Sequence, residues 1–370
     1  MSKRFLITLI TVLVIALAAG GAILLAKGYS FSTKEKRIVG TGIITVSSEP
    51  DSASVFVDGH LTTATNATIS SLPPKTYTIK ITKEGFISWE RQVDVKEGLV
   101  TPIKVTLFPA IPTIYPLTFN GVLNPTLSPD GSKLAFLVKG GKKSGVWVWT
   151  MAKNQPIFFA RSSEPHQIAT NTVTDFSKAQ LKWSPDSKQV LATVGNNNFL
   201  LSADSLNTDP RDITAILDGT LKGWEDDTRS KEVSRIETIK DNKLKQIASD
   251  SASIKWSPDE TKFMSGKDQI KVSSPKENSP TVYDLEDAKN HQLPNAKSHM
   301  WLPDSLHVIL VEDNAISIVD FDGTNKAVIY AGKFDDSLVF PWPDSSRLVF
   351  ITSFPTPTAS EPNLYGINLR

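Results

Sequence analysis

The chain contains no cysteine, few histidines and no excess of charge of either sign. Without cysteine it can form no disulfide, no thiolate metal site and no cysteine nucleophile, and it has no site for lipobox lipidation. Its net charge of +1 argues against nucleic acid as the main partner, because neutralising a phosphate backbone requires a basic face. At 370 residues the chain is long enough for two domains with ample cores.

Recognisable catalytic motifs are also missing. The chain has no Gly-x-Ser-x-Gly elbow, no phosphate-binding glycine loop and no His-Glu-x-x-His pair. Residues 320–323, Asp-Phe-Asp-Gly, resemble the start of a calcium loop, but Ala331 and Gly332 stand where its closing Glu would be, so a hairpin turn is predicted. The five histidines form no compact ligand set; they are His60, His166, His291, His299 and His307. We therefore predict no enzyme activity, with no catalytic residues, no cofactor-binding residues, no metal ligands and no cofactor.

The N-terminus carries one long apolar run. Phe5 to Ala26 contains no charged residue, and a helix of this length spans a hydrocarbon core of about 30 Å. The alternative is a cleaved signal peptide, with a small-x-small site at Ala16-Leu17-Ala18. Cleavage there would leave the rest of the apolar run on the mature protein, so we predict a retained transmembrane signal anchor over residues 1–27. The long β-rich body is then expected on the extracytoplasmic side.

A short phrase, Trp-x-Pro-Asp, recurs along the second half of the chain at intervals of 32 to 56 residues. Blades of a β-propeller repeat at about 40–50 residues, so this self-similarity predicts a propeller. In each copy the Trp ends a strand, Pro stops it, and Asp with Gly or Ser makes a turn. The copies are residues 183–186, 256–259 and 301–304, with variants at 127–131 (Leu-Ser-Pro-Asp-Gly), 342–344 (Trp-Pro-Asp) and 224–227 (Trp-Glu-Asp-Asp).

Ring closure follows from the strands at the two ends of this region. The last repeat has strands up to 364–369 but lacks a fourth, while residues 113–119 supply a spare strand before the first phrase. Pairing the two would complete the last blade and remove an exposed sheet edge. If the unit at Trp224 is counted as a blade, the region 113–370 contains six blades. The tryptophans of the phrases are predicted to be core, and loop aromatics such as Phe354 are better candidates for ligand contact.

On these phrases the region resembles the TolB-like propeller family, whose repeats carry Trp-Ser-Pro-Asp-Gly before an apolar strand. Only the first copy here keeps Asp-Gly, at Asp130-Gly131. The family includes periplasmic adaptors and substrate-gating domains of peptidases. The resemblance therefore implies binding rather than chemistry.

Residues 43–108 have a different character, with short alternating strands separated by turn signals such as Asp58-Gly59 and Glu84-Gly85. The stretches 48–59, 72–77 and 83–86 with Trp89 resemble a PEGA domain, although Lys75 and Thr76 stand where that family usually has Pro-Gly. PEGA domains are found in surface and envelope proteins and have no known catalytic residues. The resemblance implies a compact β-sandwich, and the prolines of residues 109–112 predict a stiff hinge after it.

The predicted fold class is therefore all-β, with an N-terminal transmembrane helix, a small PEGA-like β-sandwich and a β-propeller of six blades. The predicted divisions are the anchor 1–27, a polar stalk 28–42, the sandwich 43–108, the hinge 109–112 and the propeller 113–370.

The predicted function is that of a membrane-anchored extracytoplasmic binding or scaffold protein of the cell envelope, which uses its propeller for protein–protein interaction. Its expected location is the cytoplasmic membrane, as a single-pass protein. Two alternatives remain open: a cell-wall glycan-binding protein, and a propeller-based hydrolase or lyase. The expected partners are the membrane together with envelope proteins or cell-wall glycan, and no nucleic acid.

Overall fold

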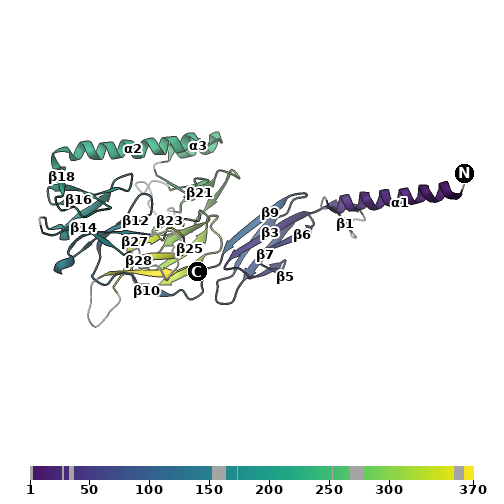
Figure 1. Cartoon of the computed structure of the whole chain (residues 1–370), viewed down its shortest axis with the longest axis horizontal. Helices are drawn as coiled ribbons and strands as arrows, with labels where there is room; N and C mark the ends of the chain where they lie inside the picture. Colours follow the sequence, from purple (N-terminus) through teal and green to yellow (C-terminus); the bar gives the residue numbers. More distant parts are fainter. Residues whose placement is uncertain are drawn as a thin grey trace. The chain divides into compact units, whose positions relative to one another are not determined.

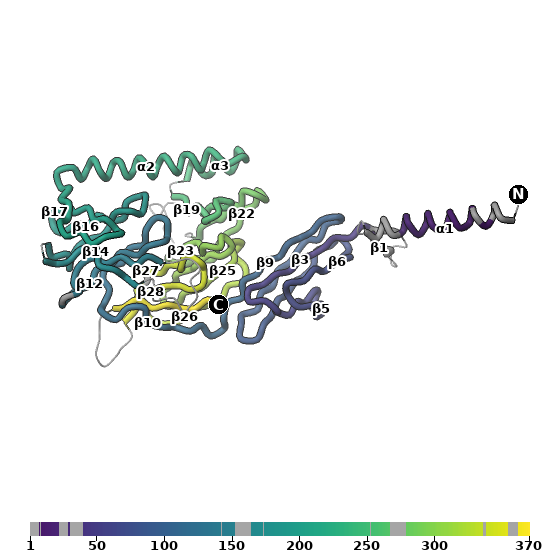
Figure 2. The backbone as a smooth tube through the Cα atoms, viewed as in Figure 1, coloured from purple at the N-terminus to yellow at the C-terminus, as the bar shows by residue number. Residues whose placement is uncertain are grey.

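The chain divides into two compact units in the computed structural model. One comprises residues 1–111 with Arg370, and the other comprises residues 112–369 (Figures 1 and 2). The structure describes residues 3–26, 29–32, 37–151, 164–172, 174–251, 253–266, 279–353 and 362–370.

The N-terminal apolar run forms helix α1 (Lys3–Ala26). An antiparallel hairpin of β1 (Tyr29–Ser32) and β2 (Arg37–Gly40) lies within the stretch expected to be a stalk. Across the described ranges, no helix combines the length and the apolar character that crossing a membrane requires. This finding contradicts the predicted transmembrane anchor over residues 1–27 and the location in the cytoplasmic membrane that depended on it. An apolar run can form a helix from local propensity alone, so helix formation does not by itself establish a membrane span.

A two-sheet sandwich follows. One sheet has the strand order β6-β3-β9, in which β3 pairs parallel with β9, and the other has the order β5-β4-β7-β8. The strands are β3 (Gly42–Glu49), β4 (Ser54–Val57), β5 (His60–Ala64), β6 (Ala67–Leu72), β7 (Thr76–Thr82), β8 (Trp89–Asp94) and β9 (Val100–Thr106).

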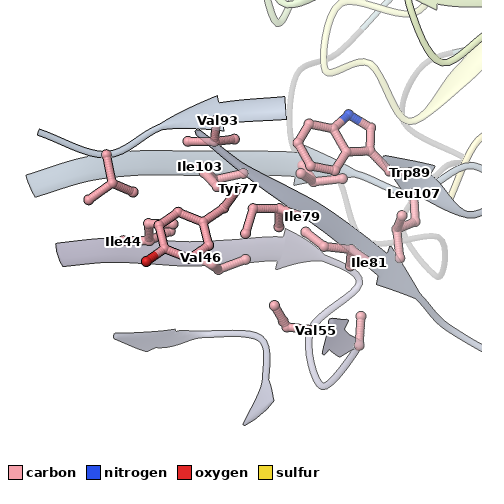
Figure 3. Packing of buried hydrophobic residues seen from close by; sticks show 13 residues of the cluster. Ile44, Val46, Val55, Tyr77, Ile79, Ile81, Trp89, Val93, Ile103 and Leu107 are labelled. Carbon is pink, nitrogen blue, oxygen red and sulfur yellow. The ribbon is translucent and has the colours of Figure 1, made fainter. Parts of the chain in front are cut away.

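The core of the sandwich lies between the two sheets, where inward-facing side chains alternate with exposed ones. In β7, Tyr77, Ile79 and Ile81 are buried, as the alternation in the sequence predicts. Figure 3 shows them packed with Ile44 and Val46 of the other sheet. Burial of this cluster is what holds the small domain together.

The second unit contains five four-stranded antiparallel sheets, which we number as blades 1 to 5. Blade 1 has β11 (Leu123–Leu127), β12 (Lys133–Val138), β13 (Gly145–Thr150) and β14 (His166–Thr170). Blade 2 has β15 (Gln180–Trp183), β16 (Gln189–Val194), β17 (Asn197–Ser202) and β18 (Arg211–Asp212). Blade 3 has β19 (Ile254–Trp256), β20 (Lys262–Ser265), β21 (Thr281–Asp284) and β22 (Lys289–Gln292). Blade 4 has β23 (Ser298–Trp301), β24 (His307–Val311), β25 (Ala315–Asp320) and β26 (Ala327–Ala331).

Blade 5 joins the two ends of the ring. Its strand order is β10-β29-β28-β27, so β10 (Ile114–Pro116) closes a sheet made otherwise from the end of the chain. Ile114 pairs with Ile367, and the Leu117 N–H donates to the Leu364 carbonyl at 2.8 Å. The predicted ring closure is confirmed. The other strands of this blade are β27 (Asp335–Pro341), β28 (Arg347–Thr352) and β29 (Asn363–Asn368).

The predicted sixth blade is wrong. Trp224 lies in helix α2 (Leu217–Glu237), which is followed by α3 (Asn242–Asp250), and both helices lie between blade 2 and blade 3 in the chain. The described residues therefore form five four-stranded blades, and the fold class is mostly β rather than all-β. The physical reason is that the phrase at Trp224 lacks the proline that stops a strand, and no alternating apolar strand follows it.

Candidate interaction surface

The repeated phrase forms the same turn in blades 1, 2 and 3. In each, the serine hydroxyl donates to the aspartate at 2.6 Å and accepts the N–H of the residue that opens the next strand at 2.9 Å. Each hydroxyl therefore joins the end of one strand to the start of the next, and its bonding capacity is used structurally. The three pairs are Ser128–Asp130, Ser184–Asp186 and Ser257–Asp259.

Blade 4 makes the turn with different chemistry. Leu302 stands at the serine position, and His307 Nδ1 instead lies 2.7 Å from Asp304 Oδ2. His307 is buried, and its Nε2 lies 3.4 Å from Asp320 Oδ1 on β25. The His307 ring thus takes the place of the missing hydroxyl beside the aspartate and packs inside the blade.

In blade 5 the phrase is shifted by one residue. The Trp342 N–H donates to the Arg347 carbonyl at 2.8 Å. In blade 2 the equivalent bond is made by the Ser184 N–H, which donates to the Gln189 carbonyl at 2.9 Å. Trp342 therefore occupies the serine position, and Pro341 occupies the tryptophan position. The turn has its full length, and only the residue types differ from the other copies.

The turn aspartates ionise more readily than usual. The hydrogen bond from Ser184 is the largest influence on Asp186 and, with the Lys188 N–H, lowers its pKa against the opposing effect of burial. Burial alone would raise the pKa of Asp304, but the hydrogen bond and charge of His307 outweigh it and leave that pKa lowered. Asp130 and Asp259 also have lowered pKa values, because hydroxyl and N–H donors outweigh their burial.

We predict that Ser184→Ala lowers the free energy of unfolding by about 1–3 kcal/mol near neutral pH, because the half-buried Gln189 N–H loses its acceptor and the Asp186 carboxylate loses a donor. A carboxylate whose pKa is lowered on folding stabilises the protein above its unfolded pKa of about 3.9, and that contribution is lost as the pH falls through the folded value. The difference between the wild type and the variant should therefore shrink below about pH 4. Urea unfolding at a series of pH values measures it; a pH-independent difference would contradict the prediction.

The tryptophans of the phrase hold neighbouring blades together. Trp183 Nε1 donates to the Thr126 carbonyl of blade 1 at 2.9 Å, and Trp301 Nε1 donates to the Lys255 carbonyl of blade 3 at 2.8 Å. Each ring is nearly buried at the junction with the preceding blade. The prediction that these residues are core is confirmed.

Trp256 of blade 3 makes the same kind of bond to helix α2. Its Nε1 donates to Glu232 Oε1 at 2.9 Å, so a side chain of α2 supplies the acceptor that a preceding blade supplies elsewhere. Arg235 Nε also lies 2.8 Å from Glu260 Oε1 in the phrase turn of blade 3. On the other side, Lys231 Nζ donates to the Pro185 carbonyl of blade 2 at 3.4 Å. The C-terminal half of α2 thus connects blade 2 to blade 3.

The two helices are packed very differently. Leu244 and Ala248 of α3 are buried with Phe263 of blade 3, whereas α2 has no fully buried side chain and only its half-buried Ile236 packs against this cluster. In Figure 1 the helices follow one another along one margin of the propeller. A surface helix of a globular protein normally buries an apolar stripe. In α2 the apolar residues Leu217, Leu221, Trp224 and Ile236 are only half-buried, so most of the helix surface is left to solvent.

We define the α2 face as the exposed side chains of this helix other than Thr228, whose hydroxyl donates to the Trp224 carbonyl, and Lys231, which binds blade 2. Val233 is 48% exposed, and Ser230, Ser234 and Glu237 lie around it on the helix surface. A single exposed valine is ordinary on a protein surface, so this face is a candidate because of how the helix is attached rather than because of Val233 alone. The face comprises Asp218, Lys222, Glu225, Asp226, Asp227, Arg229, Ser230, Val233, Ser234 and Glu237.

The histidines are dispersed in the structure. His60 is exposed at the start of β5, and His299 Nε2 lies 2.8 Å from the Pro294 carbonyl, with a pKa lowered by burial. Among the described residues, no three His, Cys, Asp or Glu side chains form a group that could hold a metal ion. Residues 320–323 form the predicted hairpin turn, in which Gly323 has a positive φ. Phe354, the predicted contact residue, lies outside the described residues.

Sequence reasoning missed the α2 face. The one signal available was negative: the segment after Trp224 is rich in charge and lacks the alternation of a strand. The exposure of the α2 side chains depends on tertiary packing, and the repeated phrase carries no information about that packing.

Comparison with known protein families finds a match within the first unit. Residues 41–111 match the family model of the PEGA domain, which confirms the resemblance drawn from the sequence. Among curated proteins, none matches this chain in sequence.

Solved structures similar to this chain include TolB-type proteins. One is a TolB of Agrobacterium tumefaciens, with 16% identity and a TM-score of 0.24 over 64% of this chain and 76% of that chain. Another is TolB from Acinetobacter baumannii, with 13% identity and a TM-score of 0.26 over 79% of this chain and 59% of that chain. A third is a eukaryotic initiation factor, with 14% identity and a TM-score of 0.21 over 79% and 62%. This chain therefore spans less than two thirds of the second and third structures.

Proposed function

We propose that this chain is a non-catalytic binding or scaffold protein whose propeller takes part in protein–protein interaction through the α2 face. The observation that carries this proposal is a helix of 21 residues that fully buries none of its side chains yet is held in place between two blades. Ordering a helix costs conformational entropy, and the half-buried side chains of α2 offset only part of that cost. Contact with a partner accounts for keeping such a helix on the surface.

The rigid attachment of α2 supports the same proposal. Glu232 and Arg235 bind blade 3, while Lys231 binds blade 2, so the C-terminal half of the helix is fixed on a rigid scaffold. Val233 lies within this fixed half and remains 48% exposed. A preorganised contact residue loses little entropy on binding, which favours affinity.

The alternatives drawn from the sequence receive less support. Aromatic rings that stack on glycans must be accessible, but Trp183, Trp301 and Trp342 are at most 6% exposed. The serine hydroxyls of the phrases are occupied by turn hydrogen bonds rather than paired with a base, which gives no support to a nucleophile at these positions. A protein partner is therefore the function that we propose.

We predict that a photo-crosslinking amino acid at Val233 captures a partner protein in the native host, whereas the same probe at Val328 does not. The two valines are matched, with 48% and 50% exposure, but Val328 lies on β26, the outer strand of blade 4. Mass spectrometry would identify the adduct. Equal adducts at both positions, or none at Val233, would contradict the proposal.

A second variant tests whether the captured protein binds through this face. Val233→Arg should reduce copurification of the same partner at least about fivefold, the loss expected for a contact residue contributing 1 kcal/mol or more. Its urea unfolding midpoint should equal that of the wild type, because Val233 is exposed and packs in no buried cluster among the described residues.

A further inference from the structure

The PEGA-like sandwich has two lateral sides that differ in chemistry. On one side, β5 and β6 are edge strands of the two sheets and are joined by the short turn at Thr65-Asn66; we call this side A. On the other side, β8 and β9 are the edge strands, and we call this side B. Unpaired backbone groups along an edge strand can pair with another chain, and natural proteins commonly block such edges with charge or proline.

Side B carries those blocking features. Strand β8 contains Glu90, Arg91 and Asp94, and β9 contains Pro102 and Lys104. A second chain pairing along side B would have to accommodate these charges and a residue that lacks an N–H. Side B is therefore protected against addition of a strand.

Side A carries none of them. From Leu61 to Pro74 the sequence contains no charged residue, and neither β5 nor β6 contains proline. Leu61 is 66% exposed, and Thr62, Thr68 and Ser70 are also exposed. An edge that is polar yet uncharged presents no electrostatic barrier to a neighbouring strand.

Two backbone carbonyls of β5 accept side-chain hydroxyls of the same strand. The Thr62 hydroxyl donates to the His60 carbonyl at 3.0 Å, and the Thr63 hydroxyl donates to the Ala64 carbonyl at 3.4 Å. These side-chain bonds are local and do not cover the edge with another element. As an edge strand, β5 has one side along which a further strand could pair.

We propose that two copies of this chain associate through side A, with β5 of one copy antiparallel to β5 of the other about a two-fold axis. A two-fold contact brings each residue close to its own counterpart, so a charged edge would oppose like charges, and side A has none. Threonine pairs directly opposite one another are favourable cross-strand neighbours. This self-complementarity selects a second copy as the occupant of side A, independently of the partner proposed for the α2 face.

The contact is expected to be weak. Register shifts interrupt the pairing of β5 with β4 and of β6 with β3, and such bulges shorten the straight edge available for pairing. A contact limited to these strands buries less than the roughly 1,200 Å² of a stable interface, so the dimer should be reversible and concentration-dependent.

The absence of native cysteine makes a direct test possible with the full chain. A single cysteine introduced as Thr62→Cys lies near the two-fold axis and should form a disulfide-linked dimer under mild oxidation, whereas Gln92→Cys, on exposed β8 of side B, should not. We expect the Thr62→Cys protein to crosslink at least about tenfold faster at equal concentration, because the dimer raises the effective concentration of its thiol. Equal rates, or faster crosslinking at Gln92→Cys, would overturn the proposal.

A pair of charge variants provides a second readout that needs no oxidation. Thr62→Lys places like charges at the axis and should abolish concentration-dependent dimerisation in sedimentation velocity, while Gln92→Lys should leave it unchanged. Because the two variants differ from the wild type by the same charge, association elsewhere in the chain affects both equally. Failure of Thr62→Lys to weaken the dimer would overturn the proposal, as would a wild type that is monomeric at all concentrations.

Discussion

Replacing Trp183 by alanine is expected to lower the free energy of unfolding by about 3–5 kcal/mol, the usual cost of truncating a large buried aromatic side chain. Trp183 is 5% exposed and lies in the cluster between blades 1 and 2. The variant would also leave the Thr126 carbonyl without the indole donor at 2.9 Å. Urea unfolding followed by intrinsic fluorescence measures this loss as a shift in the unfolding midpoint.

Trp224→Ala is the matched control, because the sequence repeat treats Trp224 and Trp183 alike. Trp224 lies in α2, is only partly buried and belongs to no buried cluster of the described residues. Alanine is the better helix former by up to about 0.7 kcal/mol, which offsets part of the lost contact. We expect a change of less than about 1 kcal/mol, in keeping with substitutions outside a core. A loss of unfolding free energy similar to that of Trp183→Ala would indicate that Trp224 is packed in a blade, and it would contradict the helical assignment.

Gly145→Ala is expected to lower the free energy of unfolding by about 2–5 kcal/mol, through steric overlap and backbone strain together. Gly145 opens β13 with a φ of +142°, a conformation that residues with a Cβ rarely adopt. A Cβ at this position would overlap the backbone carbonyl oxygen of Ala169 on the paired strand β14. Backbone atoms cannot move aside as the end of a long side chain can, so the strands would have to separate.

Gly195→Ala separates these two effects. Gly195 also has a positive φ, of +57°, but no heavy atom lies within 4 Å of the position that its Cβ would take. Only the left-handed backbone conformation then opposes the substitution, at about 1–2 kcal/mol. In thermal unfolding, the melting temperature of Gly145→Ala should lie well below that of Gly195→Ala. The reverse order of melting temperatures would refute the steric argument.

The sequence predicted those features that are encoded locally and repeated. Alternation in residues 77–81 and the turn at Asp58-Gly59 indicated the sandwich, and the phrase at Trp183 indicated the blades. Ring closure was predicted because a spare strand at one end matched a missing strand at the other. These inferences succeeded because strand periodicity and turn residues act over a few positions.

The errors arose where a segment resembles the repeated phrase in sequence but has a different backbone conformation. Trp224-Glu225-Asp226 looks like a phrase, but a helix forms because neither a proline nor an alternating strand follows. The shift at Trp342 becomes visible only when its N–H is seen to bond Arg347. The α2 face could not be predicted at all, because the exposure of Val233 depends on which other elements pack against the helix.

The closure of blade 5 has a consequence for the order in which the protein folds. Thr118 and Asn363, which meet beside this junction, are 245 positions apart, so β10 is synthesised long before its partner β29 exists. Pairings of such high sequence separation form late and slowly. Until β29 is synthesised, β28 lacks one neighbour, and blade 5, which packs against blade 1, is incomplete. A chain whose synthesis stalls before Asn363 therefore exposes an unpaired strand edge, which favours aggregation.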